Sequence, residues 1–579
     1  MDLSKIIGIA FIGLTLNGFA QRSSGDTLKS DDVFIIKEFQ PKISDAFKLS
    51  NNPRIVDTII KIEPKSNYAV APKRAETSFT TDTIRPAIMK GEPLNKLYRA
   101  YVLGGIGNNL TTRGELVLNS TRSKKWDWGL HAWHHASDGG LEDYGNSRFS
   151  DNRFNAYGQK FFFNKILSAD MKYDLNSLHR YGFNPNSYPT VVNEEFLSKD
   201  AISQRYQNIE PSVRLKSYYK DSNNINFDTK ILFSSYSDKY ESIENNTKFN
   251  LKLDRYFGEE FVTAEVKLDL NQYEALDPSK GVPIAQENTI FGFKPGIVTG
   301  GEDWLLRAAV ELDFSSGLAS SAFFFPDLYA KYNLVDDILV PFAGINGGLE
   351  RNSYKNLTRN NPFAKSYITI NNRNVKYNVY GGIRGNYSAT TSFNAQVAYR
   401  SIENMPFFIS KIDSISGTIN TISNQFDVIY DNGTMLQLTG EIGYQRINKL
   451  SLLFRADYFV YAIENQAKAW NMPDYKLSIN ANYDIGDKIV LSGDVFLVSD
   501  RTSLYVNDAT NLEITNHLGA FVDANLGVEY FLTKRWSAFL RINNLANANY
   551  QYWNEYSVQG FTLIGGMTYS FWGNKGKSN

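Results

Sequence analysis

The chain contains no cysteine. Disulfides, thiolate metal sites and a thiol nucleophile are therefore excluded, and so is a lipid anchor on an amino-terminal cysteine. The chain also lacks a charge excess, since 61 basic residues balance 61 acidic ones. A nucleic-acid-binding protein is expected to carry a basic excess, so we predict no nucleic-acid partner.

Long apolar runs are missing beyond the amino terminus, where no stretch approaches the ~18 consecutive apolar residues that a membrane-spanning helix needs. The amino terminus itself has Lys5 ahead of an apolar run over 6–16, with small residues at Gly18 and Ala20. This pattern predicts a signal peptide over 1–20, and the alternative of a buried amphipathic helix is disfavoured because the run is apolar on all sides. An exported chain without a spanning helix is secreted, periplasmic or an outer-membrane barrel.

Aromatic residues are abundant, at 14% of the chain with 35 Tyr and 38 Phe. Tyr and Phe favour strands, and Tyr and Trp favour membrane–water interfaces. A chain of 579 residues is too long for one small soluble core. A closed β-sheet escapes this limit because it grows by adding hairpins.

Residues 21–96 differ from the rest because they hold six of the 17 prolines. Short β-like pieces, VFIIKEF and DTIIKIE, lie between these prolines. Proline removes a ladder donor and favours extended or edge conformations. We predict a proline-rich periplasmic or lumenal strap that docks on a partner, and a disordered linker is the equal alternative.

From 97 to 572 the pattern changes to long alternating segments such as FVTAEVKLDLN, YKLSINANYDI and VDANLGVEYFL. One face of each segment is apolar and the other is charged or polar. Strands of a soluble sandwich usually have about 5–6 residues, whereas these segments approach the ~9–11 of a tilted membrane strand. The apolar face is explained by lipid outside the barrel, and the polar face by a water-filled lumen inside it. The sheet must close, because backbone N–H and C=O groups in lipid have to be paired. We therefore predict an all-β fold, a transmembrane antiparallel β-barrel of about 20–22 strands.

The charged face predicts a lumen wall. Its residues tune a channel or, in the more common alternative, simply solvate the wall. The residues that we assign to it are Glu265, Lys267, Asp269, Asp484, Asp523 and Glu529.

Connections alternate between tight turns and long loops, as expected for a barrel with short periplasmic turns and longer outer loops. Tight turns are predicted at 257–260, 485–488 and 532–535, where Gly, Asp and Lys supply hairpin chemistry. Long loops are predicted at 410–425 and 499–517.

The last strand has two distinct faces, and we expect it to pair with the first barrel strand near 97–107. The polar face, expected in the lumen, carries Thr562, Thr568 and Ser570, and Ile564 is an exception. The residues expected to face lipid are Phe561, Leu563, Met567, Tyr569 and Phe571.

The carboxyl-terminal stretch RINNLANANYQYWNEYSVQGFTLIGGMTYSF resembles the end of TonB-dependent receptor barrels. The shared features are the Asn544-Leu545 turn, Tyr550, Gly560 and the closing aromatic Phe571. The polar tail at 573–579 departs from that pattern, because such barrels usually end on the aromatic. The resemblance implies an outer-membrane barrel that takes up or transports a solute.

A larger departure lies at the front, because receptors of this family have a plug domain of more than a hundred residues before the barrel. Residues 21–96 are too short and lack an Ile-Arg-Gly segment. The segment DDVFIIKEFQPKISDAFKL instead resembles the strap of plugless receptor-like barrels of Bacteroidota, which implies a Gram-negative outer membrane. The alternative function is a non-transporting barrel subunit of an outer-membrane assembly or secretion complex, which docks partners through 21–96.

Catalytic chemistry has no supporting motif, and we predict no enzyme, no cofactor and no metal site. His131, His134 and His135 are close in sequence, but alternation places His134 on the other face from its neighbours. We favour an interfacial aromatic belt around Trp133, near a strand end, over a metal or haem contact. Expected partners are outer-membrane lipid and outer-membrane or periplasmic proteins.

Overall fold

The computed structural model describes residues 97–573 except 122, 188–197, 220–223, 278–280, 319, 336–337, 413–423, 447–448, 487 and 508–511. The predicted signal peptide and strap lie outside the described residues, as do residues 574–579 of the predicted tail.

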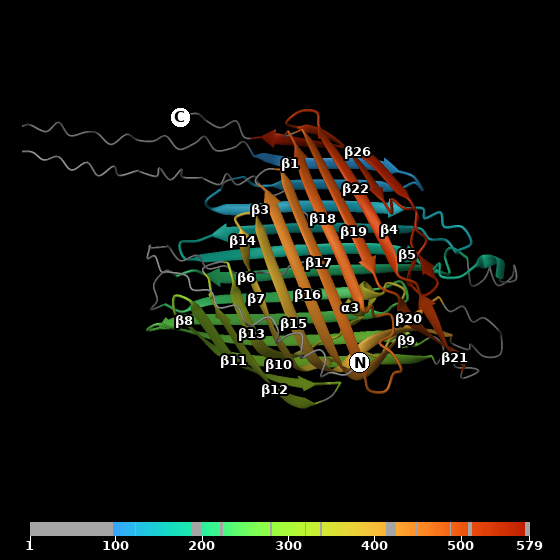
Figure 1. Cartoon of the computed structure of the whole chain (residues 1–579). Helices are drawn as coiled ribbons and strands as arrows, with labels where there is room; N and C mark the ends of the chain where they lie inside the picture. The colour runs from blue at the N-terminus through green and yellow to red at the C-terminus, as the bar shows by residue number, and fades with distance from the viewer. Residues whose placement is uncertain are drawn as a thin grey trace, which may run out of the picture. The chain divides into compact units, whose positions relative to one another are not determined.

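Twenty-two antiparallel strands of the described chain close into one barrel (Figure 1). The predicted fold class and strand number are therefore confirmed. The barrel strands are β1 (Tyr98–Gly107), β2 (Thr112–Asn119), β3 (Trp126–Ser137), β4 (Phe149–Phe161), β5 (Lys165–His179), β6 (Ser203–Ser217), β7 (Asn226–Ser237), β8 (Ile243–Phe257), β9 (Glu260–Asp277), β10 (Val282–Gly300), β11 (Trp304–Ser316), β12 (Ser321–Tyr332), β13 (Val340–Glu350), β14 (Arg373–Ser388), β15 (Thr391–Ile412), β16 (Phe426–Arg446), β17 (Leu450–Ile463), β18 (Tyr475–Ile485), β19 (Ile489–Val498), β22 (Phe521–Phe531), β23 (Trp536–Asn543) and β26 (Thr562–Gly573).

The barrel closes where the first and last strands meet. The β1–β26 register runs from Tyr98 opposite Gly573 to Gly107 opposite Ile564, so the predicted pairing of the final strand is confirmed. Ile564, the exception to the polar face of this strand, is 3% exposed and packs with Leu103 and Phe539 in a small buried cluster. An apolar residue on the inner face is thus explained by local packing across the closing pair.

The two ends of the barrel differ in their connections. At one end, the turn end, tight turns join β8 to β9, β18 to β19 and β22 to β23, as predicted, and β1 begins and β26 ends there. The opposite end, the loop end, carries the connections at 138–148, 180–202, 351–372, 464–474, 499–520 and 544–561.

The predicted long loop at 499–517 contains a hairpin that the sequence did not reveal. Strands β20 (Arg501–Asn507) and β21 (Leu512–Leu518) pair with each other, and β20 runs parallel to the end of β15. Two short strands, β24 (Gln551–Trp553) and β25 (Tyr556–Ser557), form a second small hairpin at this end.

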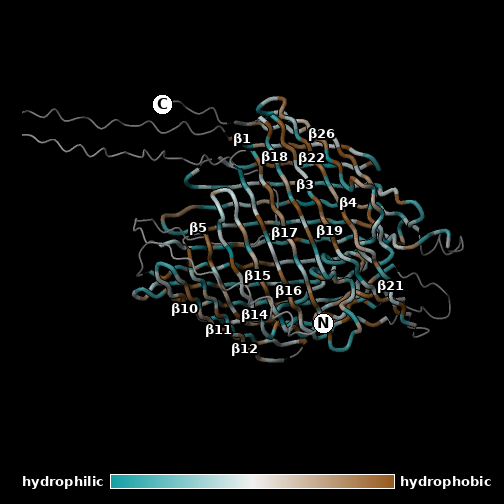
Figure 2. Tube along the Cα trace, in the orientation of Figure 1, coloured by the Kyte–Doolittle hydropathy of each residue, from teal (hydrophilic) through white to brown (hydrophobic). Residues whose placement is uncertain are grey.

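The two faces of the wall separate as the alternating pattern predicts, because successive side chains of a strand point to opposite faces. On β9, Leu270 is 40% exposed on the outer surface, whereas Asn271 and Tyr273 are 4% and 1% exposed inside. Past Leu270 the next two outward positions are Gln272 and Glu274, so the continuous apolar face of β9 is interrupted before Leu276. Figure 2 shows apolar and polar residues alternating along the strands.

Helix is scarce in the described chain, which contains the short α3 (Tyr354–Asn360) and the 3-10 turn η1 (Pro185–Ser187). No helix among the described residues is long and apolar enough to cross a membrane. The wall is tallest where β9, β10, β15 and β16 have 18, 19, 22 and 21 residues, against 8 in β2 and in β23. The extensions of these four strands meet the connection that contains α3.

Candidate functional site

The connection between β13 and β14, residues 351–372, folds into the barrel at the loop end, and we call it the crossing segment. Several of its side chains are buried as deeply as a protein core: Tyr354 is 0% exposed, and Leu357 and Ile368 are each 1% exposed. A surface loop would leave such side chains in water.

Helix α3 begins the crossing segment and docks end-on against the wall. Ser353 caps the helix, because its hydroxyl accepts a hydrogen bond from the Asn356 amide at 3.0 Å. Glu244 of β8 accepts from the amides of Tyr354 and Lys355, each at 3.0 Å. A carboxylate at a helix N-terminus satisfies orphan N–H groups and complements the helix dipole.

Two basic residues of the crossing segment pair with carboxylates of the inner wall in buried settings. Arg351 Nε lies 3.0 Å from Asp269 of β9, and Lys355 Nζ lies 2.6 Å from Glu210 of β6. The four side chains are between 8% and 16% exposed. Burial lowers the pKa of Lys355, and the contact with Glu210 partly offsets this. Asp269, predicted as a lumen-wall residue, therefore anchors the crossing segment.

A third ion pair is much more open to water. Arg359 Nη2 lies 2.9 Å from Asp174 of β5, with the two side chains 54% and 24% exposed. Exposed pairs of this kind contribute at most about 1 kcal/mol, so the buried pairs dominate the electrostatic attachment.

Tyrosines of neighbouring wall strands surround α3. Tyr354 lies between Tyr236 of β7 and Tyr273 of β9, with ring centroids 5.7 and 5.2 Å away. The Tyr236 hydroxyl lies 2.7 Å from Thr358 Oγ1, and the Tyr273 hydroxyl donates to the Ser366 carbonyl at 2.8 Å. The wall thus supplies both the apolar surface and the hydrogen bonds that the buried segment needs.

The opposite wall holds the same segment. The amide of Lys365 donates to the carbonyl of Phe426 in β16 at 2.9 Å, and the Phe426 amide donates to the Phe363 carbonyl at 3.1 Å. The Tyr430 hydroxyl donates to the Thr369 carbonyl at 3.0 Å. Strands β6 and β16 lie on opposite sides of a barrel of 22 strands, so the crossing segment spans the lumen.

The loop-end hairpin β24–β25 closes over the crossing segment. Tyr556 stacks on Phe363 with ring centroids 3.6 Å apart, and it donates to the Asn424 carbonyl at 2.5 Å. Burial raises the pKa of Tyr556, so it remains a neutral donor at physiological pH. Residues from three loop-end connections therefore meet in one buried cluster.

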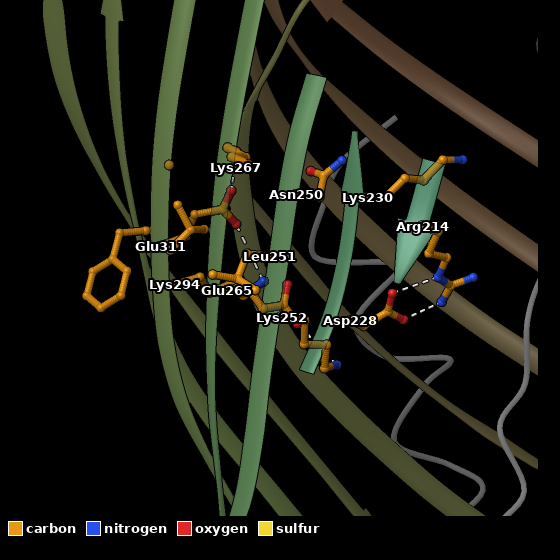
Figure 3. Close-up of a pocket in the computed structure, with 13 residues that line it drawn as sticks. Arg214, Asp228, Lys230, Asn250, Leu251, Lys252, Glu265, Lys267, Lys294 and Glu311 are labelled. Carbon is orange, nitrogen blue, oxygen red and sulfur yellow. Dashed lines mark hydrogen bonds and ion pairs between the residues drawn. The ribbon is translucent and has the colours of Figure 1, made fainter. Parts of the chain in front are cut away.

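The turn-end half of the lumen wall contains a cavity of about 340 Å³ (Figure 3). Two predicted wall residues, Glu265 and Lys267, line it. The full lining is Arg214, Asp228, Lys230, Asn250, Leu251, Lys252, Glu265, Val266, Lys267, Gly292, Phe293, Lys294 and Glu311.

Ion pairs run from strand to strand around this cavity. Lys252 Nζ lies 3.2 Å from Glu265, and Lys267 pairs with Glu311 and, at 2.9 Å, with Asp313. Burying a charge is costly unless it is paired, and the register of the strands supplies the partners.

The other predicted wall residues lie elsewhere. Asp523 accepts from the Tyr550 hydroxyl at 2.7 Å, and Glu529 accepts from Ser537 at 2.5 Å. Asp484 is exposed near the turn end of β18. These three residues contact neither the crossing segment nor the cavity lining.

The final strand presents the expected alternation. Phe561 and Met567 are 38% and 47% exposed, whereas Thr562 and Thr568 are 8% and 6% exposed. Leu563, Tyr569 and Phe571 are of intermediate exposure. That the exposed face contacts lipid remains our prediction.

The expected aromatic belt around Trp133 is wrong. Trp133 pairs in register with Glu115 and Arg153, and the Arg153 guanidinium lies 4.7 Å from its ring, so it belongs to the charged inner face. His134 lies on the other face, as predicted, between Thr112 and Asn152. Among the described residues, no group of three His, Asp or Glu side chains is arranged to hold a metal ion.

Sequence reasoning missed the crossing segment. A usable signal was the Ser353 N-cap followed by Lys355 and Arg359 at helical spacing, within a region where alternating segments were weakest. The partners of these residues lie on distant strands, so the sequence did not show that they were buried.

No known protein-family model matches the sequence, and no curated protein matches it. Solved structures are similar in fold. The pyoverdine outer membrane receptor FpvA from Pseudomonas aeruginosa PAO1 has a TM-score of 0.62 at 12% identity, over 83% of this chain and 79% of that one. The FrpB iron transporter from Neisseria meningitidis gives 0.61 at 10% identity, over 83% and 82%. The ferric-catecholate import receptor Fiu from Escherichia coli K12 gives 0.60 at 10% identity, over 82% of each chain. The barrel therefore has the fold of these outer-membrane receptors.

Proposed function

We propose that this chain is an outer-membrane barrel that takes up a solute through its lumen, and that the crossing segment closes this path until it moves. This proposal includes a location in a Gram-negative outer membrane and a similarity to the plugless receptor-like barrels of Bacteroidota. The fold shared with FpvA, FrpB and Fiu supports uptake by analogy, since one fold hosts many functions.

The observation that carries the proposal is how the lumen is closed. The crossing segment is a connection between two strands, and side-chain contacts such as Arg351–Asp269 and Lys355–Glu210 hold much of it in place. Such a segment moves without breaking the backbone ladder of the barrel. Below it, the lumen wall is charged and contains a cavity, as expected for a wet path.

A second candidate function is a non-transporting barrel subunit of an assembly or secretion complex that docks partners through 21–96. The depth of burial favours it, because Tyr354 and Ala364 are both 0% exposed. A segment packed as tightly as a protein core is also consistent with a lumen that stays permanently closed, as expected of a barrel that does not transport a solute.

Planar-bilayer conductance of the full chain tests the path. Glu350 and Arg373 pair in register, so a short Gly-Ser linker can replace residues 352–371 without stretching the wall. We expect this shortened chain to conduct steadily, and the wild-type chain to stay closed with rare openings. A folded shortened chain that is as silent as the wild type would contradict a path through the lumen.

Purification in native detergent separates the second function. Stoichiometric partners that are lost when 21–96 is removed would support the subunit, and a clean monomer would exclude it.

A further inference from the structure

Four polar side chains form a row across the turn-end half of the lumen wall, and we call it the donor row. It consists of Arg214 on β6, Lys230 on β7, Asn250 on β8 and Lys267 on β9. The strand registers place them in sequence, because Arg214 lies opposite Lys230, Lys230 opposite Asn250, and Asn250 opposite Lys267. Adjacent strands are about 4.8 Å apart, so the row extends roughly 14 Å.

The two central members of the donor row, Lys230 and Asn250, have side chains without a partner among the described residues. Arg214 forms a two-point contact with Asp228, and Lys267 pairs with Glu311 and Asp313. The side chains of Lys230 and Asn250 form no hydrogen bond or ion pair with any residue that the structure describes. Both side chains line the cavity (Figure 3).

The cavity lining has more positive than negative charge. It contains five basic residues, Arg214, Lys230, Lys252, Lys267 and Lys294, and three acidic ones, Asp228, Glu265 and Glu311. Each of the three carboxylates already has a basic partner in the lining. The remaining charge that meets no carboxylate is the ammonium group of Lys230.

A glycine on β10, the strand beyond Lys267, makes room at the end of the donor row. A Cβ atom at Gly292 would lie 2.3 Å from Lys267 Cε and 2.6 Å from Asp313 Oδ1. The absence of that atom lets the Lys267 side chain reach across β10 to Glu311 and Asp313 of β11. Lys267 is thereby held toward β11, away from the centre of the donor row, where Lys230 and Asn250 line the cavity.

We propose that the donor row binds an anionic solute, one that carries carboxylate or phosphate groups, on its way through the lumen. This inference rests on the proposed function and names the class of solute. Lys230 supplies a point charge, the Asn250 amide a neutral donor, and the free edge of the Arg214 guanidinium a further donor. Charge-assisted hydrogen bonds of this kind are short and about twice as strong as neutral ones.

Calorimetric titration of the purified full-length chain with citrate, inorganic phosphate and uncharged sucrose tests the proposal. We expect citrate or phosphate to bind and sucrose not to bind. Lys230→Gln keeps the side-chain length but removes the charge, and should weaken binding by about tenfold or more, as for the loss of one hydrogen bond to a charged group. Lys230→Arg, which keeps the charge, should stay within about threefold of the wild type.

Lys476→Gln is the matched control, because Lys476 is a basic residue of the inner face of β18 and lies outside the cavity lining. An unchanged affinity in this variant, together with the loss in Lys230→Gln, would support a local site. Equal weakening in both variants would overturn the proposal, because binding would then follow the total charge of the lumen.

The titration tests the donor-row site and the conductance assay tests the uptake function, so either hypothesis can be refuted while the other stands. A wild-type chain that binds neither anion overturns the donor-row site even if the shortened chain conducts. Anion binding without conductance in the shortened chain overturns the uptake function and leaves the site intact.

Discussion

Replacement of Arg351 by methionine should release the crossing segment from the wall. Arg351 is 8% exposed, with its guanidinium 3.0 Å from Asp269 and 3.6 Å from Glu244. Removal of one partner of a buried ion pair costs about 3–5 kcal/mol. Asp269 keeps contacts with Lys248 at 3.3 Å and Asn246 at 2.5 Å, so we take the lower end, about 3 kcal/mol. This free energy shifts the ratio of closed to open segment by roughly 150-fold, since each 1.4 kcal/mol is a factor of ten.

Single-channel recording in planar bilayers measures that shift directly as the fraction of time spent open. The matched control is Arg359→Gln, because the Arg359–Asp174 pair is 54% and 24% exposed and should contribute less than about 1 kcal/mol. We expect a large rise in open time for Arg351→Met and almost none for the control. If a folded Arg351→Met barrel stayed as closed as the wild type, the reasoning from buried ion pairs would be refuted.

Three further changes test the same architecture. The double variant Ser242→Cys/Ser366→Cys should lock the crossing segment shut when its two thiols are oxidised or joined by a short dithiol-reactive linker. The two positions are close, because the Ser242 hydroxyl lies 2.5 Å from the Ser366 carbonyl, and the chain itself has no cysteine that could compete. Single-cysteine variants that are locked shut as fully as the double variant would contradict this prediction. Gly292→Ala should displace Lys267 and lower stability by about 1–3 kcal/mol, measured by urea unfolding in lipid vesicles; an unchanged midpoint would contradict this. Phe539→Ala should weaken the closing pair of strands by about 3–5 kcal/mol in the same assay, because Phe539 is 7% exposed and covers the glycines there; a loss under 1 kcal/mol would contradict that role.

The barrel was predictable from sequence because its signal is local and repeated. Alternation within a segment such as 261–271 fixes which side chains share a face without knowledge of any partner strand. Tight turns at 257–260, 485–488 and 532–535 likewise depend on nearby residues. Closure of the sheet then follows, since backbone groups in lipid must pair, and the strand number follows from a count of the alternating segments.

The crossing segment was not predictable because its structure depends on partners far away in sequence. Glu244, which holds the first turn of α3, precedes Tyr354 by 110 residues. A helix of seven residues is unstable alone and forms only where the wall completes it. The hairpin β20–β21 was missed for a similar reason, because the end of β15 supports it.

The faces of the final strand allow a direct test of which solvent each one meets. Met567 is 47% exposed and lies near the middle of Thr562–Gly573, which places it close to the mid-depth of the apolar band. Met567→Arg should therefore cost about 2–4 kcal/mol of unfolding free energy in lipid vesicles, the cost of a charge at the bilayer midplane. Phe561→Arg, at the loop end of the same face, should cost at most about 1 kcal/mol because a charge near the interface reaches water. Equal, small costs at both positions would show that this face does not meet lipid, whereas a steep difference in cost between two residues of one face is a property of a membrane and not of a soluble sheet.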